Sequence, residues 1–196
     1  QITNDDLSAL TSIPRRIGRG GALAHRTDFW GVFQDDGSFF TAGKNNLLTG
    51  SSSVLDVDAL TAAETKFMAQ TDPDGNPLGI MPRILLVHPS NRATAFQLVN
   101  STELRGGTGL FGVSNPHAGR YQVVVSQYIT TATHWWLLAD PNDLPVIEAS
   151  FLNGRQAPTI ESAQADFNTL GVQMRGFWDF GNDKQEYRGG VKNTGA

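Results

Sequence analysis

The most suggestive chemical pattern in the sequence is a glycine-rich segment near its middle. Residues 107–112, GTGLFG, satisfy the spacing G-x-G-x-x-G. In a dinucleotide site this loop must leave a strand and open a helix, so that helix N–H groups face the phosphates. Here the pattern predicts a helix before the loop, and Pro116 and a strand after it. A surface loop explains the segment better, and we expect no cofactor.

Two further patterns could hold a metal ion, and neither meets the chemical requirements. Asp72, Asp74 and Asn76 copy calcium-loop positions, but Pro77 stands where glycine is needed and Arg83 where the closing glutamate is needed. The histidines form no H-x-x-x-H pair, so a zinc site would need the fold to collect them. They are His25, His88, His117 and His134. We therefore expect no metal site.

The sequence offers no recognisable catalytic spacing and one cluster of cations. A G-x-S-x-G elbow and a P-loop are both missing from the sequence, so we expect no intrinsic catalysis. Arg15, Arg16, Arg19 and Arg26 lie in one predicted helix and could meet phosphate. A solvated or subunit-facing side explains them better, because 15 basic against 19 acidic side chains give a net charge of -4. The same balance argues against a strongly basic nucleic-acid reader.

The composition limits the classes of protein to which the chain can belong. A chain of 196 residues can fold as one large domain or two small ones. It contains no cysteine, which excludes disulfides and thiolate chemistry, and no apolar run reaches the roughly 18 residues of a membrane span. Its 21 glycines and 17% charged residues indicate many loops and close contacts, as in a protein that meets neighbours.

The stretch 121–152 has the densest β-branched and aromatic content and predicts three strands of one sheet. Residues 123–125, VVV, are apolar on both faces, which is typical of a central strand. The other two strands are predicted over 134–138 and 146–151. Trp135 and Trp136 should point to opposite faces, with one of them in the core.

Helix signals occur before this stretch. Residues 4–6 can cap a short first helix that ends before Pro14, and Ser12 can cap a second helix that runs to Phe33. Glycines 18, 20 and 21 require either close packing or a bend there. Helices are also predicted over 56–70 and 92–100, and a buried strand over 83–88.

The remaining segments are predicted to be loops and one hairpin. Residues 39–53 read as an irregular excursion, 72–77 as a turn and 104–119 as a long loop with five glycines. Residues 172–180 and 187–192 suggest a β-hairpin around 181–183, while 157–167 are too mixed to assign.

Several short motifs occur in order along the chain. At its end they are DFG at 179–181, YRG at 187–189 and KNTGA at 192–196. Earlier ones are NDDL at 4–7, GR at 18–19, LVNS at 98–101 and WLLADP at 136–141. Together these motifs resemble the major capsid proteins of tailed phages, in particular the Mu-type head subunits and the prohead-protease/capsid fusions. Glu186 departs mildly, since the family more often has aspartate there. The likeness runs from end to end of the chain.

This resemblance implies an α+β fold of the Hong Kong 97 phage type. A peripheral domain, residues 1–55 and 158–196, would hold a spine helix over 14–33 and long strands over 172–192. An axial domain would cover residues 56–157. The family places an N-terminal arm and an extended loop before the spine helix, and only a short segment precedes it here. The resemblance therefore implies a piece of a longer subunit, which would fold but build no closed shells by itself.

The implied function is that of a head subunit that self-assembles, as hexamers and pentamers, into the DNA-containing shell. Its partners would be copies of itself, a scaffold or prohead protease, and DNA bound non-specifically, without a membrane. It would be made in the bacterial host cytoplasm and end in the virion capsid. Intersubunit contacts are expected at Arg105, Gly106, Gly107, Asp183, Lys184 and Arg188. Two alternatives stay open: an encapsulin-like nanocompartment shell, marked by a cargo groove, and a small α+β hydrolase, marked by a convergent polar pocket.

Overall fold

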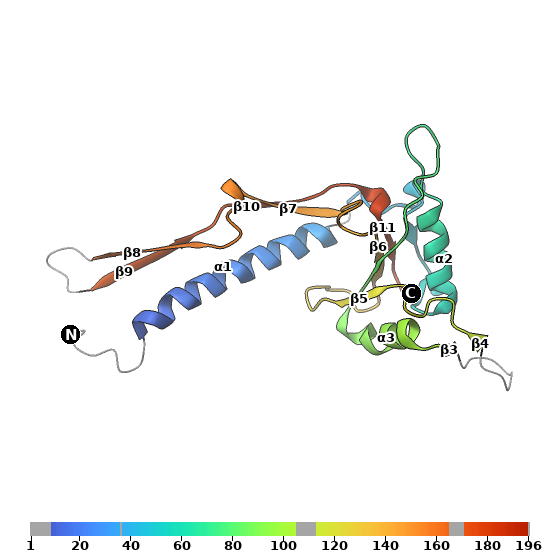
Figure 1. Ribbon diagram of the computed structural model, residues 1–196, viewed down its shortest axis with the longest axis horizontal. Helices are drawn as coiled ribbons and strands as arrows, with labels where there is room; N and C mark the ends of the chain where they lie inside the picture. The colour runs from blue at the N-terminus through green and yellow to red at the C-terminus, as the bar shows by residue number, and fades with distance from the viewer. Residues whose placement is uncertain (1–8, 36, 105–112, 165–170, 196) are drawn as a thin grey trace. The chain divides into compact units, whose positions relative to one another are not determined.

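The computed structural model describes residues 9–35, 37–104, 113–164 and 171–195, and its fold is mixed α+β (Figure 1). The helices are α1 (Ala9–Gln34), α2 (Val57–Met68) and α3 (Arg92–Asn100). The strands are β1 (Leu47–Leu48), β2 (Ile84–Val87), β3 (Glu103–Leu104), β4 (Val113–Ser114), β5 (Gln122–Val125), β6 (Trp135–Leu138), β7 (Ile147–Phe151), β8 (Thr159–Gln164), β9 (Val172–Phe177), β10 (Phe180–Lys184) and β11 (Gly190–Asn193). Two compact units result: Gln1–Phe33 with Ala149–Asp183, and Gln34–Glu148 with Lys184–Ala196.

A five-stranded sheet with the order β1-β11-β6-β2-β5 is the centre of the second unit. β6 runs antiparallel to both β11 and β2, while β5 runs parallel to β2. The prediction that residues 123–125 form a central strand is wrong, because β5 is last in the sheet and only half-buried. β7 also lies outside this sheet and pairs with β10.

One face of this sheet forms the main core with α2 and α3. Leu85, Val87, Trp135, Leu137 and Val191 alternate along β2, β6 and β11, and each is 0% exposed. Both helices begin and end close to where their sequence signals place them. Figure 1 shows α2 beside β6 and β11, and α3 near β5.

The opposite face is buried as well. Trp135 and Trp136 point to opposite faces as predicted, since neighbouring residues of a strand alternate. Both are buried, at 0% and 1% exposure, and Trp136 lies outside the main core cluster. Its neighbours include Lys192, whose Nζ lies 5.9 Å from the ring centroid. The expectation that only one tryptophan is buried is therefore wrong.

Helix α1 runs without interruption through Pro14. The prediction of a helix end before Pro14 is wrong, although the predicted helix over 14–33 is present. Proline in a helix removes one i to i−4 hydrogen bond, and the remaining turns of this 26-residue helix still form. Neither α1 nor any other helix in the described part of the chain combines the length and apolarity of a membrane span.

The first unit pairs α1 with a β-ribbon made by β8 and β9. These strands are antiparallel, from Thr159 opposite Phe177 to Gln164 opposite Val172. The predicted hairpin of 172–180 with 187–192 is therefore wrong: β9 pairs with β8, and β11 belongs to the five-stranded sheet. The strand over 159–164 escaped prediction because a two-stranded ribbon buries little, so its sequence need not alternate.

Glycines let α1 and this ribbon approach closely. A Cβ on Gly176 would overlap Cγ2 of Ile17, and a Cβ on Gly21 would lie 3.5 Å from Pro158. Gly18 faces Ile160 at 3.7 Å in the same way, whereas a Cβ on Gly20 would meet nothing within 4 Å. The close packing expected at these helix glycines is thus present at two of them.

We expect Gly20→Ala and Gly176→Ala to change stability in opposite directions. Gly20→Ala should raise the free energy of unfolding by up to about 1 kcal/mol, because alanine favours a helix and has room there. Gly176→Ala should lower it by about 1 to 3 kcal/mol, because the new methyl group overlaps Ile17. Urea denaturation followed by circular dichroism measures both. Equal changes in the two variants would refute the close approach.

Candidate functional site

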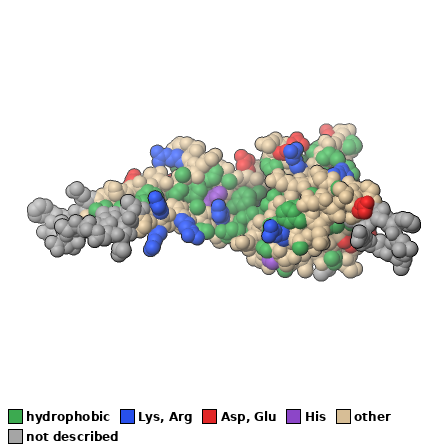
Figure 2. All heavy atoms as spheres, turned by 60° about the horizontal axis from the view of Figure 1, so that its bottom comes forward, with side chains coloured by type: hydrophobic (Ala, Val, Ile, Leu, Met, Phe, Trp, Pro, Cys, Tyr) green, Lys and Arg blue, Asp and Glu red, His purple; other side chains and the backbone are tan. Residues whose placement is uncertain are grey.

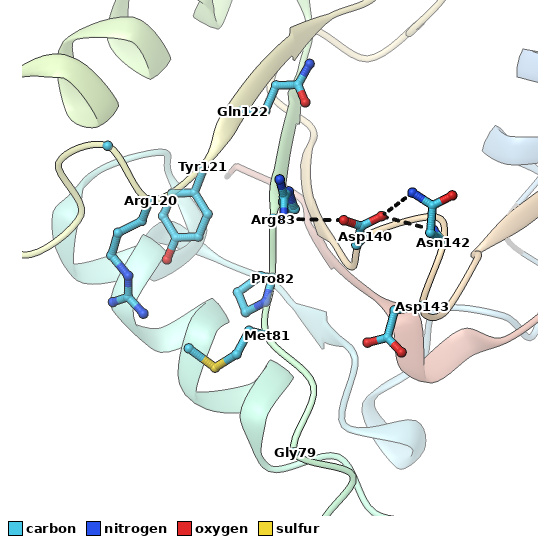
Figure 3. A pocket seen from close by; sticks show the side chains of 11 residues that line it. Gly79, Met81, Pro82, Arg83, Arg120, Tyr121, Gln122, Asp140, Asn142 and Asp143 are labelled. Carbon is cyan, nitrogen blue, oxygen red and sulfur yellow. Dashed lines mark hydrogen bonds and ion pairs between the residues drawn. The ribbon is translucent and has the colours of Figure 1, made fainter.

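A polar pocket of about 930 Å³ lies at one edge of the five-stranded sheet (Figure 3). Arg83 precedes β2 and Tyr121 precedes β5, while Asp140 follows β6. Because β6 is antiparallel to the other two strands, these three ends meet at the same edge. The pocket therefore collects side chains that are far apart in the sequence.

Two charged side chains of the pocket, Arg83 and Asp140, are paired with each other. Arg83 Nη1 lies 3.4 Å from Asp140 Oδ2, and Figure 3 shows the two side chains pointing toward each other. The backbone N–H and the side-chain amide of Asn142 both donate to Asp140 Oδ1 at 3.0 Å. The pKa of Asp140 is lowered, first by the hydrogen bond from the Asn142 backbone and also by Arg83. The hydrogen bonds from Asn142 close a turn. Together with Arg83, they give each oxygen of the Asp140 carboxylate a partner.

A buried ionic cluster lies next to the pocket. Glu64 comes from α2, with 6% of its side chain exposed, and Arg120 Nη2 lies 2.5 Å from its Oε1. His117 Nδ1 lies 3.6 Å from Glu64 Oε2 and 3.3 Å from the hydroxyl of Tyr121. His117 Nε2 lies 2.9 Å from Thr61 Oγ1. The cluster ties α2 to the segment that leads into β5.

The histidine of this cluster is held neutral. Thr61 donates its hydroxyl hydrogen to the Val57 carbonyl at 2.8 Å, so His117 Nε2 must supply the hydrogen in its own contact with Thr61. Burial lowers the pKa of His117, and nearby Glu64 opposes this only in part. Burial and Glu64 together raise the pKa of Tyr121. Both side chains are therefore uncharged at neutral pH.

We expect His117 to make the second unit sensitive to mild acid. Because its folded-state pKa lies below the unfolded value of 6.5, the unfolded chain binds the proton more readily. The stability that neutral His117 provides is therefore present above pH 6.5 and lost as the pH falls through and below it. Urea denaturation of wild type and His117→Gln between pH 7.5 and 5.5 should show a flatter dependence in the variant. Parallel curves would contradict this assignment.

The arrangement gives no support to the hydrolase alternative. Neither serine nor histidine lines the pocket. Elsewhere His88 Nδ1 lies 2.7 Å from Ser90 Oγ, but this nitrogen also accepts the Ser90 backbone N–H and so caps a short 3₁₀ turn. Among the described residues, no carboxylate contacts His88 to orient it. The pair thus lacks the third group that activates a nucleophile.

The other candidate ligands are likewise explained by local structure. Asp72 Oδ1 accepts the backbone N–H groups of Asp74 and Asn76, at 2.9 and 2.8 Å. These contacts lower the pKa of Asp72, chiefly through the Asn76 side chain. The structure does not gather the histidines, and among the described residues no group of three or more His, Asp or Glu could hold a metal. Residues 107–112 lie outside the described residues, between the antiparallel strands β3 and β4.

The residues expected at subunit contacts have different surroundings. Arg105, Gly106 and Gly107 lie outside the described residues. Asp183 is exposed, and Lys184 Nζ lies 5.5 Å from the centroid of the Phe39 ring. Arg188 is used within its own subunit: Nε donates to the Thr71 carbonyl at 2.8 Å and Nη1 to Glu186 at 3.0 Å.

Sequence reasoning missed the Glu64–Arg120 pair. A signal for it existed, because Glu64 falls one turn after Leu60 on the apolar stripe of a predicted helix, where a charge requires a partner. Its partner lies 56 positions further along the chain, so a local sequence pattern could not identify that partner.

Comparison with known proteins identifies the family. The family described as phage capsid protein matches residues 1–193. The crystal structure of a phage-related protein from Bordetella bronchiseptica RB50 is similar in fold, with a TM-score of 0.51 and 14% sequence identity. That alignment covers 100% of this chain and 69% of the other. A comparison with curated proteins gives no match. Because the family match spans nearly the whole sequence, the chain belongs to the phage capsid protein family.

Proposed function

We propose that this chain is part of the structural subunit of a phage or prophage icosahedral head, a subunit that builds the shell with copies of itself. The family match over residues 1–193 carries the proposal. The site geometry supports it, because Arg83 of the pocket pairs with Asp140, Arg120 pairs with Glu64, and neither serine nor histidine lines the pocket. The role is structural rather than enzymatic, and the place of action is the virion capsid after synthesis in the host cytoplasm.

The fold we propose for it is the Hong Kong 97 type, as in the Mu-type and protease-fusion subunits that the sequence resembles. A long helix beside a β-ribbon, as in the first unit, suits a peripheral domain. A five-stranded sheet under two helices, as in the second unit, suits an axial domain. A scaffold, a prohead protease and non-specifically bound DNA are the further partners that this role implies.

Electron microscopy of the full-length protein after expression tests the role. Closed particles of uniform size are the expected result. Purified protein that stays monomeric at high concentration, with and without its scaffold, would contradict the proposal. Particles that enclose a co-purified protein instead of nucleic acid would identify a nanocompartment shell.

We expect charge reversal at Asp183 or Lys184 to impair assembly. Asp183 is exposed at the end of β10, and a charge pair across a subunit interface affects association more than the fold. Asp183→Lys and Lys184→Glu in the full-length subunit should reduce the yield of particles. The melting temperature of the unassembled protein should stay nearly unchanged.

Arg188→Gln is the matched control for these variants. Its contacts to Thr71 and Glu186 are internal, so it should lower the melting temperature of the unassembled protein. Normal particles from both reversals would remove Asp183 and Lys184 from the proposed interface.

A further inference from the structure

Four arginines of α1 are exposed on the surface of the first unit, and three of them, Arg15, Arg19 and Arg26, form a row. Arg15, Arg16, Arg19 and Arg26 are all exposed. None of them has a hydrogen bond or ion pair to another residue in the described part of the chain. The first acidic residue of the helix is Asp28, and it accepts a hydrogen bond from Asn182. All charged side chains of the helix up to Thr27 are therefore positive.

Helix geometry makes this row straight. At 3.6 residues per turn, Arg15, Arg19 and Arg26 fall within a sector about 40° wide and span about 16 Å along the axis. Ile17 and Gly21, which meet the β-ribbon, lie about 120° to 160° around the helix from Arg15. The row thus points away from the packed side of α1. Figure 2, in which the bottom of Figure 1 faces the reader, shows several Lys and Arg side chains on the visible surface of this part of the molecule.

A straight row of guanidinium groups matches a phosphate backbone. Each guanidinium presents a planar fork of donors that fits phosphate or carboxylate oxygens. Each strand of double-stranded DNA carries one phosphate per roughly 3.4 Å of helix axis, so the row would lie beside a continuous series of negative charges. Contacts between these arginines and phosphates would not depend on the base sequence of the nucleic acid.

A second copy of this chain is a poorer match. Many of its carboxylates already accept hydrogen bonds or ion pairs inside their own subunit: Asp28, Asp56, Glu64, Asp72, Asp140, Glu161 and Glu186. Among the described residues, no helix or strand carries a row of carboxylates to face the arginines. Because the net charge is -4, the four arginines of α1 are a local concentration of positive charge in a chain that is not basic as a whole.

We propose that the arginine row of α1 binds the phosphate backbone of double-stranded nucleic acid without sequence preference. The inference rests on the proposed shell role, because the enclosed nucleic acid supplies the partner. Binding of one subunit should be weak, with dissociation constants in the range of about 10⁻⁴ to 10⁻⁶ M typical of non-specific complexes. Many copies in one shell would add these weak contacts together.

Fluorescence anisotropy with a labelled duplex of arbitrary sequence, titrated over a series of salt concentrations, tests the row. Arg15→Gln/Arg19→Gln removes two charges from it. Arg83→Gln/Arg92→Gln removes two exposed arginine charges elsewhere and serves as the matched control. The slope of log affinity against log salt should fall by about two in the first variant, since each lost phosphate contact lowers it by about one. The control should keep the wild-type slope.

Three results would overturn the inference. These are no binding by wild type at low salt, equal losses in both double variants, and a change in self-association of Arg15→Gln/Arg19→Gln without DNA, which would make the row a subunit interface. Particle formation by the full-length Arg15→Gln/Arg19→Gln variant distinguishes failure of the arginine-row proposal from failure of the shell proposal. If this variant forms normal particles and binds DNA as wild type does, only the arginine-row proposal is refuted. If the wild-type protein binds DNA but forms no particles, the shell proposal is refuted.

Discussion

Trp135→Ala is expected to lower the free energy of unfolding of the second unit by about 3 to 5 kcal/mol. The indole is 0% exposed in the main core, so alanine leaves a cavity that the close-packed neighbours fill only in part. Its Nε1–H also donates to the Ser53 carbonyl at 2.8 Å, and alanine leaves this acceptor without its donor. Trp136→Ala should cost a similar amount, because that ring is 1% exposed on the opposite face.

Trp135→Phe separates the two contributions. Phenylalanine keeps most of the apolar area but cannot donate to Ser53, so the loss should be smaller, about 1 to 3 kcal/mol. Urea denaturation followed by far-ultraviolet circular dichroism measures all three variants. A loss below about 1 kcal/mol for Trp135→Ala would refute the packing of this sheet. A large loss for Trp135→Ala and a negligible one for Trp136→Ala would show that the second face is not a core.

The helices of the second unit could be predicted because their signals are local. Asp56 precedes an apolar stripe, and in the structure its carboxylate accepts the Ala59 N–H at 2.7 Å. Leu60 and Phe67 are both 0% exposed, as their spacing indicates. The helix over 92–100 was predicted to the residue for the same reason. In contrast, α1 overrides the local signal of Pro14 through its length and its packing on the ribbon.

The strands could be located but their partners could not. The four-residue runs of β2, β5 and β6 are apolar apart from Gln122, and nothing in them indicates that β2 lies between the other two. Similarly, 172–177 has a ribbon partner in 159–164, whose mixed sequence carries no strand signal. Pairing depends on contacts between distant segments, and short strands encode it weakly.

The glycines of the closing motifs show what resemblance alone leaves unexplained. Gly195 has a φ of +71°, and a Cβ there would overlap the Thr133 carbonyl. A Cβ on Gly189 would lie 2.6 Å from the Leu144 carbonyl oxygen. Both positions therefore require glycine for close backbone approach. The motif pattern could be recognised in the sequence, but its physical cause lies in segments about 45 to 60 positions upstream.

Arg120→Met is expected to lower the free energy of unfolding by about 2 to 4 kcal/mol at pH 7. Removing one partner of a buried ion pair leaves an uncompensated charge, which typically costs about 3 to 5 kcal/mol. Glu64 would be that charge, with 6% of its side chain exposed. Arg120 is 38% exposed, so water already screens the pair and reduces the expected loss. Methionine preserves the apolar stem of the side chain.

Glu64→Gln/Arg120→Met is the control that isolates the charge. With no carboxylate left to bury, the double variant should recover most of the stability that Arg120→Met loses, and the double-mutant cycle gives the coupling free energy. No recovery in the double variant would show that Arg120 contributes packing rather than charge.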